Sequence, residues 1–168
     1  MSVETAETTH LADARIAPAL ELVWREAHLL DRKQYEEWDR LWAPGGLYVI
    51  PIEPDSEDFE SALNMVYDDD RMRRMRIERL TSGYSISATA AARTVRTLSR
   101  FVVQHRDEES VELCSAQVLV GHRREETFVL AADVTHRIRL DGPRPLIQQK
   151  VVRLINSTDS VNSSGFLL

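Results

Sequence analysis

The sequence contains a single cysteine, Cys114, among its 168 residues. One cysteine excludes an internal disulfide and is typical of a protein that works in a reducing compartment. It also excludes a metal cluster held by several thiolates, because only one thiolate is present. Five histidines occur, and no two of them have the close spacing of a metal-ligand pair. We therefore expect neither a metal nor another cofactor in this chain.

Long hydrophobic runs and an excess of positive charge are also missing. No apolar stretch approaches the ~20 residues that span a bilayer, and the first nine residues are polar, unlike a secretory signal. The formal net charge is -6, which disfavours nucleic acid and anionic membranes as partners. Glycine-rich phosphate loops and the Gly-x-Ser-x-Gly nucleophile motif do not occur. We expect a soluble, cytoplasmic protein that binds neither nucleic acid nor a membrane.

The second half of the chain contains four segments with the composition of long β-strands, at residues 93–104, 110–122, 127–140 and 146–156. Short turns rich in charged residues and glycine separate these segments, and such turns join antiparallel neighbours. At about 3.3 Å per residue the strands would be roughly 36 to 46 Å long, so the sheet must twist and curl. Its concave face then needs a cover.

Two helices in the first half of the chain are predicted to supply that cover. Pro18 suits the first turn of a helix that runs to about Asp31, with Glu26 expected to face water. Its apolar stripe consists of Leu20, Val23, Trp24, Ala27 and Leu30. A second helix is predicted at 32–41, ended by the Pro-Gly-Gly sequence at 44–46. Its aromatic-rich side consists of Tyr35, Trp38, Leu41 and Trp42.

A strand and a third helix are expected next. Residues 47–52 predict a strand that lies at a sheet edge or ends at Pro51, because proline lacks the ladder N–H. Residues 62–67 are either a strand or the lead-in to a helix that the three aspartates at 68–70 open and that runs to about Leu80. Met72 and Met75 are its core candidates, and ion pairs are expected between Asp69 and Arg73 and between Asp70 and Arg74. The basic run 71–76 indicates a solvated face or a subunit contact rather than a nucleic-acid site.

These elements predict one α+β domain. Residues 1–16 are polar and predict a mobile N-terminal arm, 81–92 predict a loop, and 17–168 form the single domain. We expect a strongly curved mixed sheet, mainly antiparallel, with the N-terminal helices packed on its concave face.

Several stretches, in matching order and spacing, resemble one family, the small (beta) subunit of aromatic-ring-hydroxylating dioxygenases. They are residues 26–31 (EAHLLD), 35–42 (YEEWDRLW), 67–71 (YDDDR), 79–83 (RLTSG), 93–96 (RTVR), 149–154 (QKVVRL) and 166–168 (FLL). The resemblance covers nearly the whole chain from about Leu20.

That resemblance implies a fold and an assembly. The fold would be a cone similar to nuclear transport factor 2, scytalone dehydratase and ketosteroid isomerase. The assembly would be a homotrimer of this chain that supports three large (alpha) subunits. In the family the large subunit carries a Rieske [2Fe–2S] cluster and mononuclear Fe(II) and hydroxylates an aromatic ring, while the small subunit is structural. This chain would then be a non-catalytic subunit that serves aromatic compound catabolism.

An independent enzyme of the same fold is the alternative, as a dehydratase or isomerase acting on an apolar ring compound, and a ligand-binding protein is a third possibility. Proton transfer next to a carbonyl needs a carboxylate or histidine opposite a tyrosine-like donor, and the candidates are Tyr48, Asp133 and His136. His136 shares a strand face with apolar residues, which favours a core or interface histidine bound to a backbone carbonyl. Asp133 points the other way and is expected to pair with a cross-strand arginine.

The candidate interface residues are charged or apolar and lie in two places. On the first long strand, Arg96 and Arg100 are expected to share a face with apolar side chains, where charges need partners that another subunit would supply. The apolar end of the chain follows a Ser-Ser-Gly sequence and is expected to pack at a subunit boundary. The predicted interface residues are Arg93, Arg96, Arg100, Phe166, Leu167 and Leu168.

Overall fold

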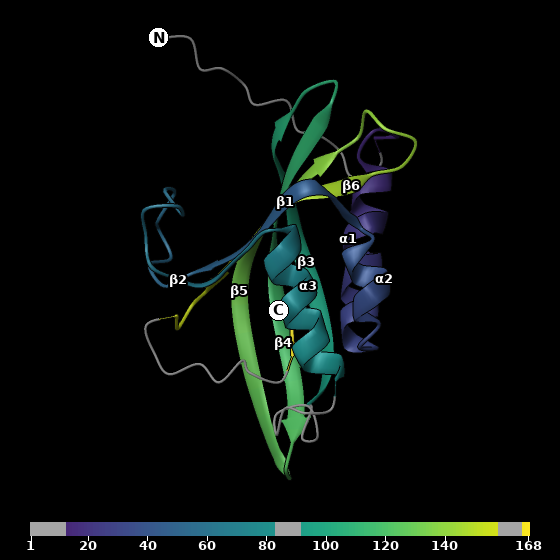
Figure 1. Ribbon diagram of the computed structural model, residues 1–168. Helices are drawn as coiled ribbons and strands as arrows, with labels where there is room; N and C mark the ends of the chain where they lie inside the picture. Colours follow the sequence, from purple (N-terminus) through teal and green to yellow (C-terminus); the bar gives the residue numbers. More distant parts are fainter. Residues whose placement is uncertain (1–12, 83–91, 158–165) are drawn as a thin grey trace.

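The computed structural model describes residues 13–82, 92–157 and 166–168 (Figure 1). Within these residues the helices are α1 (Ala17–Asp31), α2 (Tyr35–Asp39) and α3 (Asp70–Thr81). The strands are β1 (Trp42–Pro51), β2 (Asn64–Asp68), β3 (Arg93–Arg106), β4 (Ser110–Arg123), β5 (Glu126–Arg139) and β6 (Leu146–Leu154). The six strands that the described residues form make one sheet in the order β2-β1-β6-β5-β4-β3.

All neighbouring strands are antiparallel except β1 and β6, which run parallel. Parallel neighbours need a long connection, and the one between β1 and β6 includes β2, α3, β3, β4 and β5. Figure 1 shows α1 and α2 side by side along one side of the molecule, with α3 in front of the long strands. We call the sheet face that packs against the helices the inner face, and the opposite face the outer face. The predicted mixed, mainly antiparallel α+β architecture is confirmed.

The core lies between the helices and the inner face. On β4 every second residue from Val111 to Gly121 is buried, and on β5 the same alternation runs from Ala132 to Ile138. This period of two is what a strand with one covered face requires. Fully burying one such aliphatic side chain contributes roughly 1.5–3 kcal/mol, so the alternation fixes which face points inward.

The four long strands and two of the helices agree with the sequence prediction. The strand boundaries differ from the predicted ones by at most two residues, and the short segment before α3 is a strand, β2. Helix α3 begins as predicted, because the Asp69 carboxylate accepts a hydrogen bond of 2.9 Å from the Met72 N–H. Residues 1–12, 83–91 and 158–165 lie outside the described residues, and so do most of the predicted arm and loop. Ile16, at the end of that arm, is buried.

The region around residues 32–51 differs from the prediction. Helix α2 has only five residues, and Trp42 already belongs to β1. The Pro-Gly-Gly sequence at 44–46 therefore lies inside β1, where the register with β6 shifts between Trp42 and Leu47. Gly45 has φ +77°, which glycine adopts without strain. Strand β1 does end at Pro51, as one of the two predictions stated, but it is not an edge strand, since β2 and β6 flank it.

Helix α3 buries a cation where methionines were expected. Met72 and Met75 are 40% and 44% exposed, whereas Arg73 is only 2% exposed. The Arg73 guanidinium lies 4.2 Å from the centre of the Trp42 ring and binds the Gly46 carbonyl. It also pairs with Asp70 at 2.6 Å and with Asp39 at 3.3 Å. The predicted partner of Arg73, Asp69, caps the helix instead, so the basic run is only partly a solvated face.

Candidate functional site

One polar row crosses the inner face of the sheet. Tyr48 of β1 pairs with Lys150 of β6, and Lys150 pairs with His136 of β5. Residues paired across neighbouring strands point to the same face, so all three side chains meet in the interior. Each is 1% exposed. Such burial is costly for polar groups unless they are paired.

Helix α1 supplies the partner of this row. The Glu26 carboxylate, 2% exposed, accepts a hydrogen bond from the Lys150 ammonium at 3.0 Å and contacts His136 Nε2 at 2.7 Å. The Trp38 indole of α2 donates a third hydrogen bond to Glu26 at 2.9 Å. One carboxylate therefore connects α1, α2, β5 and β6.

The electrostatics of the cluster favour charged Glu26. Burial opposes the charged form, yet Lys150 and His136 together hold the pKa of the Glu26 carboxyl below its ordinary value. Burial lowers the pKa of Lys150, and the Glu26 charge opposes that change. Burial also raises the pKa of Tyr48, which keeps the phenol neutral and able to donate.

The end of the chain fills the space beside this cluster. The main-chain oxygen of Leu168 accepts hydrogen bonds from Lys150 Nζ at 2.8 Å and from the Tyr48 hydroxyl at 3.0 Å. The Leu168 N–H donates back to the Tyr48 hydroxyl at 3.0 Å. The Arg96 guanidinium donates to the main-chain oxygen of Leu167 and pairs with Asp31 at the end of α1. Tyr48 and Lys150 thus meet the main chain of residues 166–168 rather than open space.

Phe166 completes this packing. Its ring stacks on that of Phe128, with 5.4 Å between centroids and 21° between planes. Opposite Phe128 on β4 is Gly121, where a Cβ atom would lie only 2.2 Å from the Phe128 ring. The glycine therefore leaves the space that the Phe128 ring takes.

The outer face of the sheet exposes apolar side chains. Val95, Val120 and Val129 face one another across β3, β4 and β5, and Val118 lies two residues from Val120 on the same face. These four valines, which we call the outer apolar patch, are 67%, 43%, 61% and 39% exposed in that order. A contiguous exposed apolar row marks an interaction surface more often than isolated apolar residues do.

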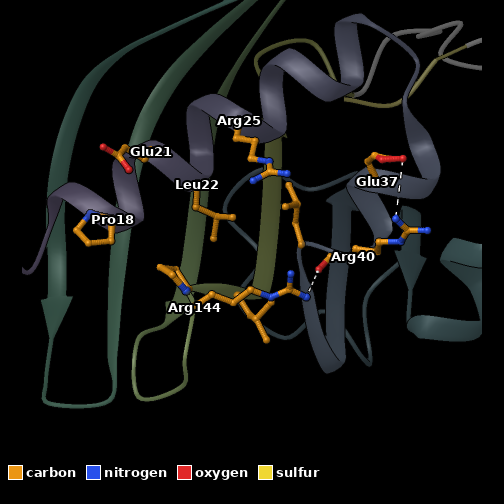
Figure 2. Close-up of a pocket in the computed structure, with 10 residues that line it drawn as sticks. Pro18, Glu21, Leu22, Arg25, Glu37, Arg40 and Arg144 are labelled. Atoms are coloured by element: carbon orange, nitrogen blue, oxygen red, sulfur yellow. Dashed lines mark hydrogen bonds and ion pairs between the residues drawn. The ribbon is translucent and has the colours of Figure 1, made fainter.

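Among the open cavities at the surface of the described residues, two border helix α1 and the outer face of the sheet. One of about 360 Å³ lies between α1, α2 and the β5–β6 connection (Figure 2). In Figure 2 Arg25 extends from α1 toward this space and Arg144 reaches toward the main chain of Arg40, to which it donates at 3.3 Å. The other, of about 450 Å³, lies on the outer face beside Arg100 and Asp133. Neither is lined by Tyr48, His136 or Lys150.

Comparison with known proteins decides the family. A family model described as "Ring hydroxylating beta subunit" matches residues 25–160. This chain belongs to that family. A curated relative, the 2-halobenzoate 1,2-dioxygenase small subunit of Burkholderia cepacia, is 28% identical over 95 residues, which are 54% of this chain and 58% of that subunit.

Solved structures show the fold of this beta-subunit family. The benzoate 1,2-dioxygenase beta subunit of Burkholderia mallei superposes with a TM-score of 0.74 at 17% identity, covering 90% of this chain and 97% of that one. A putative scytalone dehydratase of Novosphingobium aromaticivorans superposes with a TM-score of 0.63 at 11% identity, covering 83% of each chain. The predicted cone fold is thereby confirmed.

The structure does not bring together the three catalytic candidates that the sequence suggested, Tyr48, Asp133 and His136. Tyr48 and His136 lie on the inner face, but Asp133 lies on the outer face and pairs with Arg100, as the cross-strand prediction stated. The predicted carbonyl partner of His136 is replaced by the Glu26 carboxylate. The acid of the cluster is therefore not the one that the sequence suggested.

Sequence reasoning missed Glu26 and Lys150. Glu26 was expected to face water, yet it lies three or four residues from the buried Leu22, Val23, Leu29 and Leu30. That spacing places it on the buried stripe of α1. Trp24, which was placed on the stripe, is 53% exposed. Lys150 alternates with the buried Val152 and Leu154, so a period of two could have located it.

A bulge separates the predicted interface arginines. The register of β3 with β4 shifts between Ser99 and Val102, and Arg100 has φ +52°. Arg96 consequently points inward while Arg100 and Val102 point outward, so the prediction that Arg96 and Arg100 share a face is wrong. Arg93 is exposed.

Some of the residues that were expected to be buried by another subunit are already buried within this chain. Arg96 and residues 166–168 are at most 9% exposed within this single chain. A role for Arg93 and Arg100 at a subunit boundary stays a prediction.

In the part of the chain that the structure describes, no three or more histidine, cysteine, aspartate or glutamate side chains are grouped so that they could hold a metal ion. Among the described helices, none is long and apolar enough to cross a bilayer.

Proposed function

We propose that this chain is the non-catalytic small subunit of a Rieske non-heme iron aromatic-ring-hydroxylating dioxygenase. Three copies would associate and seat three large subunits, which would carry the Rieske [2Fe–2S] cluster and the mononuclear Fe(II). Membership of the beta-subunit family supports this role, and so does the name of the curated relative, a dioxygenase small subunit. The proposed context is the catabolism of aromatic compounds in the cytoplasm.

The observation that carries the proposal is the contrast between the occupied space beside Tyr48 and Lys150 and the apolar patch on the outer face. An independent dehydratase or isomerase needs space between its tyrosine and its acid or base. Here the main chain of Leu168 bonds to both Tyr48 and Lys150. The outer apolar patch instead lies exposed on the long strands, where another protein chain can cover it.

The size of the outer apolar patch indicates how much of the interface it can provide. Burying four half-exposed valines is worth about 4 kcal/mol per subunit. Association costs about 4–15 kcal/mol in lost translational and rotational freedom. The patch therefore needs neighbouring surface as well. Arg93 and Arg100 lie on the same outer face, and we propose them as polar rim residues of this interface.

Size-exclusion chromatography with light scattering tests the proposal, on the chain alone and mixed with a candidate large subunit. We expect a mass of three times the 19.2 kDa of one chain, and a larger complex in the mixture. Val120→Asp should dissociate the trimer, because a carboxylate would be desolvated in the interface. Leu63→Asp is the matched control, since Leu63 is 81% exposed and lies outside the patch. A monomeric chain that still binds the large subunit, or a trimer unaffected by Val120→Asp, would contradict the proposed interface.

A further inference from the structure

Helix α3 exposes a surface of methionine and arginine side chains. Met72 and Met75 are 40% and 44% exposed, and their spacing of three residues places them on the same side of the helix. Arg71, Arg74 and Arg79 are exposed around them, and none of the three forms an ion pair with a residue that the structure describes. We call these five side chains the α3 face. Methionine and arginine are enriched at protein interfaces, so the α3 face suits a partner surface that offers both apolar side chains and carboxylates.

A ring of three copies needs such a second surface. A threefold contact is heterologous, so each chain contributes two different surfaces to it. The outer apolar patch is one of them under the proposed function, and the patch must therefore meet a different surface of the neighbouring copy. Apart from the α3 face, the described helices expose one large apolar side chain, Trp24, which already packs edge-on against Phe101 with 6.1 Å between ring centroids. Leu63 and Ile155 lie singly in connections, so the α3 face is the best complement for the patch.

Acidic residues gather in the connection between β1 and β2. Residues 53–60, which we call the acidic loop, contain five exposed carboxylates: Glu53, Asp55, Glu57, Asp58 and Glu60. Within the described residues the loop has one ion pair, between Glu57 and Arg153 at 2.9 Å, and none with α3. Most of its carboxylates are thus available to cations of another chain.

The acidic loop adjoins the face of the sheet that carries the outer apolar patch. Glu57 of the loop and Asp133 of β5 both line the outer-face cavity of about 450 Å³. Asp133 lies four residues from Val129 of the patch on the same strand, a distance of about 13 Å. The α3 face is about 12 Å long. One helix can therefore cover the valines of the patch and reach the carboxylates of the loop at once.

We propose that the α3 face of one copy covers the outer apolar patch and the acidic loop of the next copy. This inference rests on the proposed trimer and identifies the two surfaces that meet in it. Met72 and Met75 pack against the valines of the patch, while Arg71 and Arg74 pair with carboxylates of the loop. Complementary charges contribute specificity and register more than raw affinity, so the loop sets the direction in which α3 lies on its neighbour.

Charge reversal on each surface tests this pairing. The helix variant carries Arg71→Glu and Arg74→Glu, the loop variant carries Asp55→Lys and Glu60→Lys, and the combined variant carries all four substitutions. The helix and loop variants each bring like charges together and should raise the concentration at which half of the chains are trimeric by at least about tenfold. The combined variant restores opposite charges and should return that concentration to within about threefold of the wild type. Sedimentation equilibrium measures it for the chain alone, or for the complex with the large subunit if trimers form only there.

The matched control carries Arg25→Glu and Arg40→Glu, which change the net charge as much as the helix variant does but lie on α1 and directly after α2. It should leave the trimer unchanged. Equal weakening by the control and the helix variant, a trimer unaffected by either reversal, or no recovery in the combined variant would each overturn the pairing and leave the proposed trimer standing. A wild-type chain that forms no trimer, either alone or with the large subunit, would contradict the proposed function as well.

Discussion

The inner and outer faces of the same strands differ in which side chains they bury: the inner face buries polar groups, and the outer face leaves apolar ones exposed. On the inner face the polar groups Lys150, His136 and Arg96 are buried, and each has a carboxylate partner from α1. On the outer face the valines of the outer apolar patch are exposed, and the ion pair between Arg100 and Asp133 is more than half exposed. A chain that satisfies its buried charges internally but leaves apolar side chains uncovered has completed its own fold, and the uncovered side chains form the surface that we propose for partners.

The largest expected effect comes from removing the carboxylate that the inner face depends on. Glu26→Ala leaves Lys150 buried without a counter-ion and should reduce the free energy of unfolding by about 3–5 kcal/mol. Urea denaturation measures the change. Glu21→Ala, at an exposed position on the same helix, is the control and should change stability by less than about 0.5 kcal/mol. Similar losses for the two variants would mean that the Glu26 cluster does not stabilise the fold.

Lowering the pH should reduce the stability that the Glu26 cluster contributes to the fold. The folded-state pKa of Glu26 lies below its ordinary value of 4.5, so its contribution to stability is complete above that pH and is lost as the pH falls below it. The stability difference between the wild type and Glu26→Gln should therefore be largest near pH 7 and narrow between about pH 4.5 and pH 3. Denaturant unfolding at several pH values gives this difference. A constant difference over that range would show that Glu26 does not titrate as the geometry requires.

Substituting each of two arginines on β3 compares the inner and outer faces directly. Arg96→Ala removes a buried guanidinium from Asp31 and from the oxygen of Leu167, and should cost about 2–3 kcal/mol. Arg100→Ala breaks an exposed ion pair and should cost less than about 1 kcal/mol in the isolated chain. If unfolding experiments ranked the two variants the other way, the inward and outward assignment at the bulge would be wrong.

The smallest effects concern two valines on β5. Val134 is fully buried and Val129 is 61% exposed. Val134→Thr buries a hydroxyl and should cost about 1–2 kcal/mol, whereas Val129→Thr should change the stability of the chain by less than about 0.5 kcal/mol. Thermal unfolding of both variants measures the contrast. Equal shifts would mean that the outer face near Val129 is covered within the chain.

The sequence predicts those features that depend on local periodicity. The long strands, α1, the start of α3 at an aspartate cap and the pairing of Asp133 with an arginine all follow from spacing and residue type. The bulge at Arg100 could not be predicted from the sequence. One extra residue in β3 exchanges the side chains that point inward with those that point outward, and the hydrophobic pattern of the strand does not mark its position.

The burial of three charged residues was missed for a different reason. Glu26, Arg73 and Lys150 are charged, and charged residues are ordinarily exposed. Their burial depends on partners far away in the sequence, as with Glu26 and Lys150, which are 124 positions apart. Local patterns carry no information about such partners, and only the assembled sheet brings them together.

The polar row across β1, β6 and β5 also affects how the strands align during folding. If β6 slid by one residue, Lys150 would turn to the outer face, and Gln149 or Val151 would meet Glu26 instead. The carboxylate would then be buried without its ammonium, a penalty of several kcal/mol that purely apolar strands would not impose. A single lysine thus makes the misaligned sheet far less stable than the correct one.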